Sequence, residues 1–244
     1  MSVIQKKISI ITPSLNQGRF IEDNIISVLN QNYQNYEHIV VDGGSEDDTL
    51  EILKKYKHLK WISEKDKGAA NAINNGFRLA EGEIFGWLNA DDFYDNNVLE
   101  TINNEFNNGF DMVYGNLTFL DEFKNLRYAD KTVEYNKEYL LNFAPDVRQP
   151  STFFSRRLFE RTGGLNESLK LVFDFELIIR MLENSKIKLV DKNFAFYRDY
   201  DQTLTRKFVR RQAIELFFTG RKYGSKLLSV YNRKILKKLL FGKL

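Results

Sequence analysis

The sequence predicts an α/β protein in which helices cover a predominantly parallel sheet. Three observations predict this class. Short β-branched runs alternate with stretches of helical periodicity, short connections join them, and a polar cluster follows each of the first four strand-like runs. Strands joined through helices form right-handed βαβ units, so their carboxyl ends meet at one edge of the sheet. A chain of 244 residues is long enough for one such domain with a full core.

Four strand-like runs order the first half of the chain. They lie at residues 8–12, 36–42, 60–63 and 84–89. The polar clusters that follow them are Thr12 to Asn16, Asp42 to Ser45, Glu64 to Gly68 and Asn89 to Asp92. Ligands of open parallel sheets bind outside the carboxyl ends of the strands, so the four clusters predict one site.

Three helices are expected between these strands. In residues 19–31, the apolar side chains that share one helical face are Ile21, Ile25, Val28 and Leu29. Ser45 and Asp48 have the spacing of a capping box, which predicts the start of the second helix. The third helix is expected at residues 69–80.

The second half of the chain is less regular. Strands are expected at residues 111–116, 117–120 and 151–155, and edge strands at 187–190 and 194–197. Helices are expected at residues 136–143, 156–164 and 173–182.

The charge of the chain is unevenly distributed. Residues 206–244 hold 12 Lys and Arg residues and one acid, Glu215, which leaves 24 basic and 32 acidic residues in the rest. The chain has no Cys, which fits a reducing compartment, and residues 6–14 enter a strand without a secretory signal. No run of about 18 apolar residues occurs, so no bilayer span is expected. We therefore expect a cytoplasmic location, at the inner face of the cell membrane if the basic segment binds lipid.

The motifs exclude several kinds of site. No G-x-G-x-x-G follows the first strand, and no P-loop sequence occurs. His38 and His58 lie in a strand and an amphipathic helix, which argues against a zinc cluster or a Ser-His-Asp triad. The remaining candidate ligands are carboxylate and amide oxygens, which suit Mg²⁺ or Mn²⁺. Asp91 and Asp92 could hold such an ion, or they could form a solvated turn or helix cap.

The order of the motifs resembles glycosyltransferase family 2. The similar stretches are ITPSLNQGRFIEDNIISVLNQ, IVVDGGSEDDT, ISEKDKGAANAINNGFRLAEGEIFGWLNADD, RQPSTFFSRRLFERTGGLNE and FDFELIIR, and the likeness runs from about Ile8 to Arg206. The resemblance implies a GT-A-like three-layer α/β/α sandwich with a predominantly parallel mixed sheet and a DXD-type motif. It also implies inverting sugar transfer from a nucleotide-diphosphate sugar, most often UDP-linked, to a saccharide or lipid-linked acceptor in surface polysaccharide synthesis.

The resemblance also implies roles for particular residues. The expected nucleotide-binding residues are Thr12, Pro13, Asn16, Asp42, Glu64, Asp66, Lys67 and Asp91. Asp42 would accept a hydrogen bond from the base. Asp91 and Asp92 would hold Mn²⁺ or Mg²⁺ on the diphosphate, and Asp174 would be the general base, with Glu176 as second candidate. Asp174 could instead act as a helix cap.

The chain departs from the family pattern at three places. Asn89 is the first residue of the acidic motif, so the metal would depend on Asp91 and Asp92 alone. Where many members have a His near the end of the domain, the candidates here are Asp199, Tyr200 and Asp201. Ala70 and Asn71 replace bulkier or acidic residues, so contacts to the ribose would differ.

The basic segment predicts a second unit of structure. We expect a catalytic domain at residues 1–205 and a helical extension at 206–244. In residues 225–244, the apolar side chains at helical spacing are Leu227, Leu228, Tyr231, Ile235 and Leu239. Such an amphipathic helix would lie on an anionic membrane or pack on the domain or on the second subunit of a homodimer. Nucleic acid is disfavoured because no recognition motif accompanies the basic residues.

Two other classes of function compete with a transferase. A sugar nucleotidyltransferase shares a similar α/β plan, but the glycine-rich signature with Arg and Lys expected after its first strand is absent. A non-catalytic sugar- or nucleotide-binding module would use the same fold without Asp174 as a base.

Overall fold

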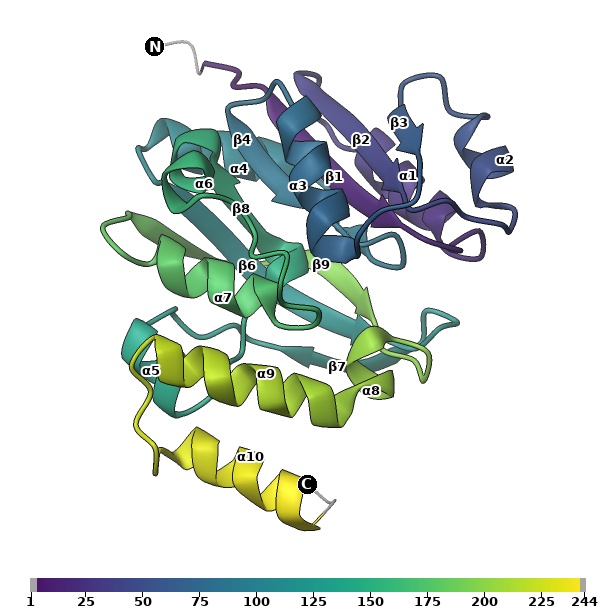
Figure 1. The fold of residues 1–244 in the computed structure, drawn as a ribbon. Helices are drawn as coiled ribbons and strands as arrows, with labels where there is room; N and C mark the ends of the chain where they lie inside the picture. The colour runs from purple at the N-terminus through teal and green to yellow at the C-terminus, as the bar shows by residue number, and fades with distance from the viewer. Residues whose placement is uncertain (1–3, 242–244) are drawn as a thin grey trace.

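The computed structural model describes residues 4–241 and consists of one mixed sheet between helical layers (Figure 1). The sheet has nine strands, eight of them in the order β3-β2-β1-β4-β8-β6-β9-β5, and β7 pairs with residues 117–120 of β6. The strands are β1 (Ile8–Ser14), β2 (Tyr36–Asp42), β3 (Lys60–Ser63), β4 (Ile84–Trp87), β5 (Phe93–Tyr94), β6 (Met112–Leu120), β7 (Leu126–Asp130), β8 (Thr152–Ser155) and β9 (Ile187–Arg198). β1 to β4 run parallel, as expected, and β8 is antiparallel to both β4 and β6.

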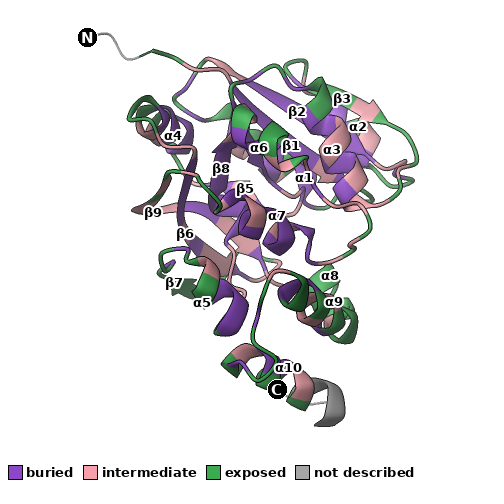
Figure 2. Ribbon diagram, turned by 60° about the vertical axis from the view of Figure 1, so that its left-hand side comes forward, coloured by how far each residue is buried: buried purple, intermediate pink, exposed green. Residues whose placement is uncertain are grey.

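Helices cover both faces of the sheet, which confirms the three-layer α/β/α sandwich (Figure 2). Its helices are α1 (Ile21–Leu29), α2 (Thr49–Leu53), α3 (Ala69–Leu79), α4 (Val98–Asn107), α5 (Lys137–Asn142), α6 (Arg156–Thr162) and α7 (Phe173–Met181). One core cluster packs α3, α6 and α7 against one face, and two others pack α1, α2 and α4 against the opposite face. A 3-10 turn, Gln149–Ser151, precedes β8.

The structure corrects several local predictions. The second helix begins at Thr49 and has no side-chain cap, because the hydroxyl of Ser45 donates to Asp42 instead of capping the helix. Residues 112–120 form one strand rather than two. The two expected edge strands are likewise one strand, β9, which lies inside the sheet between β6 and β5. The strands β5 and β7 and the helix α4 were not predicted.

The basic segment contains three helices rather than one. They are α8 (Leu204–Lys207), α9 (Val209–Lys222) and α10 (Val230–Phe241). The predicted helix at 225–244 begins only at Val230, and Leu227 and Leu228 lie exposed in the turn before it. Leu239 lies among the residues whose side chains are not described, whereas Ile235 is buried. Among residues 4–241, no helix has the length and apolar character that a bilayer crossing requires.

Candidate active site at the carboxyl edge of the sheet

Hydrogen bonds join the loops that follow β1 and β2. The amide of Asn16 donates to Ser45 Oγ (2.7 Å), and Asn16 Oδ1 accepts from the amide of Glu46 (2.8 Å). Asn16 has a φ of 52°, a left-handed conformation that asparagine tolerates better than most residues. Two of the predicted polar clusters therefore meet at one edge of the sheet.

Asp42 is fully buried at the end of β2 and is held by its own loops. Its Oδ2 accepts from the amides of Gly44 (3.1 Å) and Ser45 (2.9 Å) and from Ser63 Oγ (2.7 Å) at the end of β3. Its Oδ1 accepts from Ser45 Oγ. Three of these four donors reach Oδ2 and one reaches Oδ1, so Oδ1 is the oxygen with a further lone pair for an N–H group of a base.

The residues predicted to line the nucleotide pocket differ in exposure. Thr12 is fully buried, and its hydroxyl contacts His38 Nε2 (2.9 Å) and Asn24 Oδ1 (3.2 Å). Burial lowers the pKa of His38 to about 3, so this ring is neutral. The side chain of Thr12 thus faces the interior, whereas Pro13 is half-buried and Asn16 is exposed.

The loop after β3 leads into the amino terminus of α3. Glu64 and Lys67 are exposed there, and Asp66 is half-buried. Asp66 Oδ1 accepts from the amide of Gly68 (2.7 Å), which has a φ of 115° and precedes the first residue of α3. The turn at Gly68 has a left-handed backbone conformation, which glycine adopts more easily than other residues. This turn lies at the same edge of the sheet as Asp42, together with the three charged residues.

Asp91 and Asp92 occupy different environments. Asp92 is fully buried, and its carboxylate accepts from the amide of Arg198 (3.0 Å) and from Asn89 Nδ2 (3.3 Å). Burial and the neighbouring Asp91 raise the pKa of Asp92 well above its usual value. Asp91 is only partly buried, and its Oδ2 accepts from the hydroxyl of Tyr200 (3.1 Å). Burial also raises the pKa of Asp91. The motif therefore contains one internal and one accessible carboxyl group.

Arg198, at the end of β9, offsets the charge of this pair, a role that its local sequence does not indicate. Its guanidinium carbon lies 4.9 Å from the ring centre of Phe20 and 5.0 Å from that of Phe93. The guanidinium donates to the carbonyl of Asp91 (2.7 Å) and pairs with Asp23 on α1. A cation held between two rings beside two carboxyl groups favours their ionised forms.

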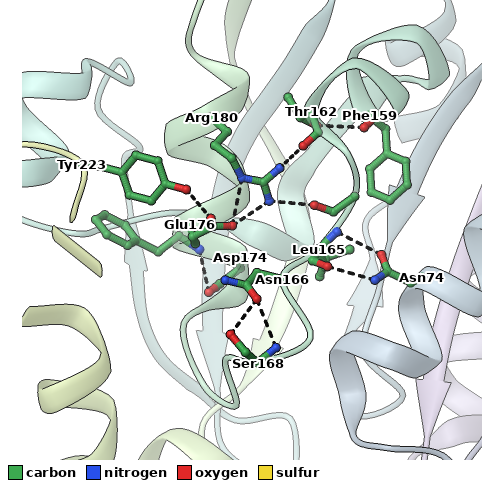
Figure 3. Close-up of polar contacts among 12 residues, drawn as sticks. Asn74, Phe159, Thr162, Leu165, Asn166, Ser168, Asp174, Glu176, Arg180 and Tyr223 are labelled. Atoms are coloured by element: carbon green, nitrogen blue, oxygen red, sulfur yellow. Dashed lines mark hydrogen bonds and ion pairs between the residues drawn. The ribbon is translucent and has the colours of Figure 1, made fainter. Parts of the chain in front are cut away.

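Asp174 lies at the start of α7 and lines a small pocket (Figure 3). Its carboxylate accepts from the amide of Phe175 (2.8 Å), and burial raises its pKa to about 6. The other residues that line the pocket are Trp87, Gln149, Thr152, Phe154, Leu177 and Ile178. A partly accessible carboxylate between apolar walls has the environment of a general base.

Gln149 connects this pocket with the acidic motif. Its Nε2 donates to the carbonyl of Trp87, and its Oε1 accepts from Asn89 Nδ2 (3.3 Å), the same amide that contacts Asp92. Gln149 therefore lines the pocket of Asp174 and also contacts the segment 89–92, so the two are not on opposite sides of the molecule. Gln149 belongs to the RQPST stretch, but nothing in its local sequence indicates this role.

Glu176, the second candidate base, is occupied by other partners. It is buried, pairs with Arg180 (2.6 Å) and accepts from the hydroxyl of Tyr223 (Figure 3). This geometry favours Asp174 over Glu176 as the group that faces a substrate.

The donor set fits a metal that is bound partly by substrate. In the part of the chain that the structure describes, no three His, Asp or Glu side chains gather closely enough to enclose an ion. Mg²⁺ is commonly held by one or two carboxylates together with phosphate oxygens. The accessible carboxyl group of Asp91, supported by Asp92, is compatible with that arrangement.

An α/β/α sandwich with an acidic motif after β4 and a polar site at its carboxyl edge has the GT-A architecture. The profile of the family described as Glycosyl transferase family 2 matches residues 9–165. The chain belongs to this family.

Curated relatives and solved structures agree with this assignment. Chondroitin synthase of Escherichia coli is 29% identical over 76% of this chain and 28% of its own length. The putative teichuronic acid biosynthesis glycosyltransferase TuaG of Bacillus subtilis is 28% identical over 80% of this chain and 88% of its own length. An uncharacterized glycosyltransferase of Rickettsia typhi is 31% identical over 74% of this chain and 60% of its own. The chain thus spans less than two thirds of the length of two of these relatives.

Two solved structures share the fold at low sequence identity. Residues 1–349 of S. aureus TarS in complex with UDP match with a TM-score of 0.70 and 19% identity, over 96% of this chain and 70% of that one. The mannosyltransferase PcManGT from Pyrobaculum calidifontis, in complex with GDP-Man and Mn²⁺, has a TM-score of 0.68 and 18% identity, over 97% and 70%.

Proposed function

We propose that this chain transfers a sugar from a nucleotide-diphosphate sugar to a hydroxyl group of a saccharide or lipid-linked acceptor, with inversion at the anomeric carbon. The observation that carries the proposal is that Gln149 lines the pocket of Asp174 and also contacts Asn89 of the acidic motif. Chondroitin synthase, TuaG and TarS support a role in surface polysaccharide synthesis and a UDP-linked donor.

The donor would bind along the edge formed by the loops after β1 to β4. Thr12, Pro13 and Asn16 would border the nucleotide from the first loop. Asp42 would accept the N–H group of the nucleobase at Oδ1, beside the hydroxyl of Ser45. The donor contacts from the third and fourth loops would come from Glu64, Asp66, Lys67 and Asp91.

Asp91, with Asp92 behind it, would hold Mn²⁺ or Mg²⁺ against the diphosphate. A divalent ion bound there neutralises the negative charge that develops on the leaving nucleotide. The hydrogen bonds from Arg198 and Asn89 keep Asp92 fixed, so the accessible Asp91 is the better placed of the two to face the donor.

Asp174 would act on the acceptor. Its carboxylate removes the proton of the acceptor hydroxyl as that oxygen attacks the anomeric carbon, and the nucleotide diphosphate leaves from the opposite side. One displacement of this kind inverts the anomeric centre without an enzyme nucleophile. Because burial raises the pKa of Asp174 to about 6, the group is ionised near neutral pH and still basic enough to accept a proton.

Asp174→Asn tests the catalytic role. We expect turnover to fall by a factor of about 10² to 10⁴, because a positioned general base contributes on that order. Binding of the nucleotide should persist, since Asp174 is not among the residues expected to contact it. Turnover is measured as nucleotide release with water as the acceptor, and binding by titration calorimetry. Full turnover in this variant would remove Asp174 from the mechanism and favour a non-catalytic binding module.

The nucleotide and metal are tested by thermal shift. UDP and GDP are added with and without Mn²⁺, because a ligand that binds only the folded state raises the apparent stability. We expect UDP with Mn²⁺ to raise the Tm most. In Asp91→Asn, the rise in Tm should no longer depend on Mn²⁺. A larger Tm shift with GDP than with UDP would overturn the assignment of uracil as the nucleobase. A Tm shift that is the same with and without Mn²⁺ would overturn the metal-binding role of Asp91 and Asp92.

We also propose that the extension contacts an anionic membrane surface. On α9, Ile214 and Phe218 are 44% and 67% exposed at i and i+4, and the exposed Arg211 and Lys222 lie on the same face. Apolar side chains among basic ones suit the interface of an anionic leaflet. This would place a cytoplasmic enzyme near a lipid-linked acceptor.

A further inference from the structure

The only acid of the basic extension contacts the chain that leads to the proposed base. Glu215 lies on α9, and its Oε2 accepts from the backbone amides of Lys170 (3.1 Å) and Leu171 (2.9 Å). Its other oxygen accepts from Arg211 Nε (3.0 Å). One carboxylate oxygen thus holds two consecutive amides just ahead of α7.

Tyr223, at the end of α9, contacts the residues that follow the proposed base. Its hydroxyl donates to the buried Glu176, which pairs with Arg180 (Figure 3). Arg180 in turn donates to the carbonyls of Thr162 and Gly164 (2.7 Å to the latter). The helix α9 therefore holds the chain on both sides of Asp174, at residues 170–171 before it and at Glu176 after it.

The same segment also touches the donor side of the site. Lys170 Nζ donates to the carbonyl of Lys67 (3.1 Å), and Glu167 accepts from Asn71 (2.9 Å) and Asn74 (2.8 Å) on α3. The chain from Glu167 to Leu171 is thus fixed to α3 at one end and to α9 at the other. A shift of α9 would move the start of α7 relative to the donor loops.

We propose that Glu215 and Tyr223 are positioning residues, which set the place of Asp174 relative to the bound donor. The inference rests on the proposed role of Asp174 as base. Reacting groups must lie within a few tenths of an ångström of the productive geometry, and a misplacement of about 1 Å can lower a rate about 10²-fold. The extension is then part of the catalytic architecture, in addition to its proposed membrane contact.

The test uses the full chain and four variants. Glu215→Ala removes the acceptor of both amides, Glu215→Gln keeps an oxygen there without the charge, and Tyr223→Phe removes only the hydroxyl. Glu183→Gln is the matched control, because Glu183 is exposed just after α7 and pairs with Lys137 on the surface. Nucleotide release from the nucleotide sugar selected by thermal shift, with water as acceptor, gives kcat and KM.

We expect kcat to fall roughly ten- to a hundredfold in Glu215→Ala and Tyr223→Phe, with partial recovery in Glu215→Gln. The dissociation constant of the nucleotide should stay within about twofold of the parent value, which also shows that the variants are folded. The acid limb of the pH–kcat profile should move to lower pH, because a loosened segment admits water and relieves the burial that raises the pKa of Asp174. A merely structural role would lower the Tm without moving this limb.

The outcomes separate this inference from the proposed function. If Asp174→Asn loses turnover while Glu215→Ala and Tyr223→Phe keep the parent kcat and pH profile, the positioning role is wrong and the proposed function stands. If Asp174→Asn is fully active, Asp174 is not the general base, and the positioning role of Glu215 and Tyr223 fails with it. Should Glu215→Ala not fold, Glu215→Gln and Tyr223→Phe decide by the same criteria.

Discussion

Burial of a carboxylic acid beside a candidate substrate pocket should affect both rate and stability, and Asp174 is such a group. Its pKa of about 6 follows from loss of solvent around the carboxyl group, opposed by the hydrogen bond from the amide of Phe175. In its proposed role the group works only when ionised, so kcat should decline as the pH falls through about 6. The same ionisation costs free energy in the folded state.

Asp174→Asn should therefore stabilise the protein at neutral pH. The pKa of Asp174 is raised by folding from an ordinary value of 3.8, so the parent loses stability as the pH rises from about 4 to above 6, whereas the amide does not titrate. We expect a gain of up to about 3 kcal/mol in the free energy of unfolding at pH 7.5, and none below pH 4. Urea denaturation at both values checks this, with Asp201→Asn, at an exposed side chain, as control. An equal change at both pH values would contradict it.

Arg198→Met should destabilise the protein strongly. Its guanidinium is buried, pairs with Asp23 and lies beside Asp91 and Asp92, so its removal leaves buried carboxyl groups without their cation. Loss of one partner of a buried pair costs roughly 3–5 kcal/mol. The matched control is Arg206→Met, because Arg206 is 42% exposed in its pair with Asp199 and should cost about 1 kcal/mol or less. Equal urea midpoints for the two variants would refute the structural role of Arg198.

At the scale of elements, hydrophobic periodicity predicted β1 to β4 and their helices because each lies within one run of sequence. It did not predict that β9 is continuous, because Asp191, Lys192 and Asn193 in its middle are typical of a turn. In the structure their neighbours pair with β6 through an irregular register, and Asn193 contacts both Thr118 and Asp95. Contacts between distant strands decide this element.

Gly76 allows α3 to lie close to β1. A Cβ added there would collide with Ile11 Cγ2 and lie 3.2 Å from Val41 Cγ2. Gly76→Ala should therefore destabilise the protein by about 1–3 kcal/mol from overpacking, despite the higher helix propensity of alanine, worth about 1 kcal/mol. Thermal denaturation measures the net effect of overpacking and helix propensity in Gly76→Ala. The control is Leu79→Ala, at a 49% exposed position of the same helix. A stabilised Gly76→Ala variant would show that the helix can move outward freely.

For the whole molecule, the sequence predicts a candidate site because parallel strands bring their carboxyl ends to one edge. Asp42 and the segment 89–92 were predicted in this way, and Asp174 through the resemblance. Arg198, Gln149 and Tyr223 were missed because their roles depend on partners far away in the chain; Arg198, for example, contacts Asp91 across 107 residues. No local pattern marks such a residue.

The charge distribution over the molecule makes the proposed membrane contact testable. Phe218→Asp should weaken binding to vesicles of phosphatidylglycerol and phosphatidylcholine several-fold, because it replaces a 67% exposed ring among basic residues with an acid. Binding should also fall as salt rises. The control is Phe123→Asp, an equally exposed ring outside the extension. Sedimentation with the vesicles measures the binding of both variants. An equal loss of vesicle binding in the two variants would argue against α9 as the membrane contact.

The position of Arg198 between Phe20 and Phe93 also determines when a newly made chain can complete the acidic motif. That motif is complete only after β9, which carries Arg198, has joined the sheet. Asp23, Asp91 and Arg198 leave the ribosome far apart in time, and the strand that carries Arg198 inserts between two strands made earlier. Until that insertion, the acidic motif is without its buried cation, and hydration must compensate its charges. Slow, non-local pairing of this kind delays assembly, so a nascent chain that ends before Arg198 would have the outline of the sheet without a finished donor edge.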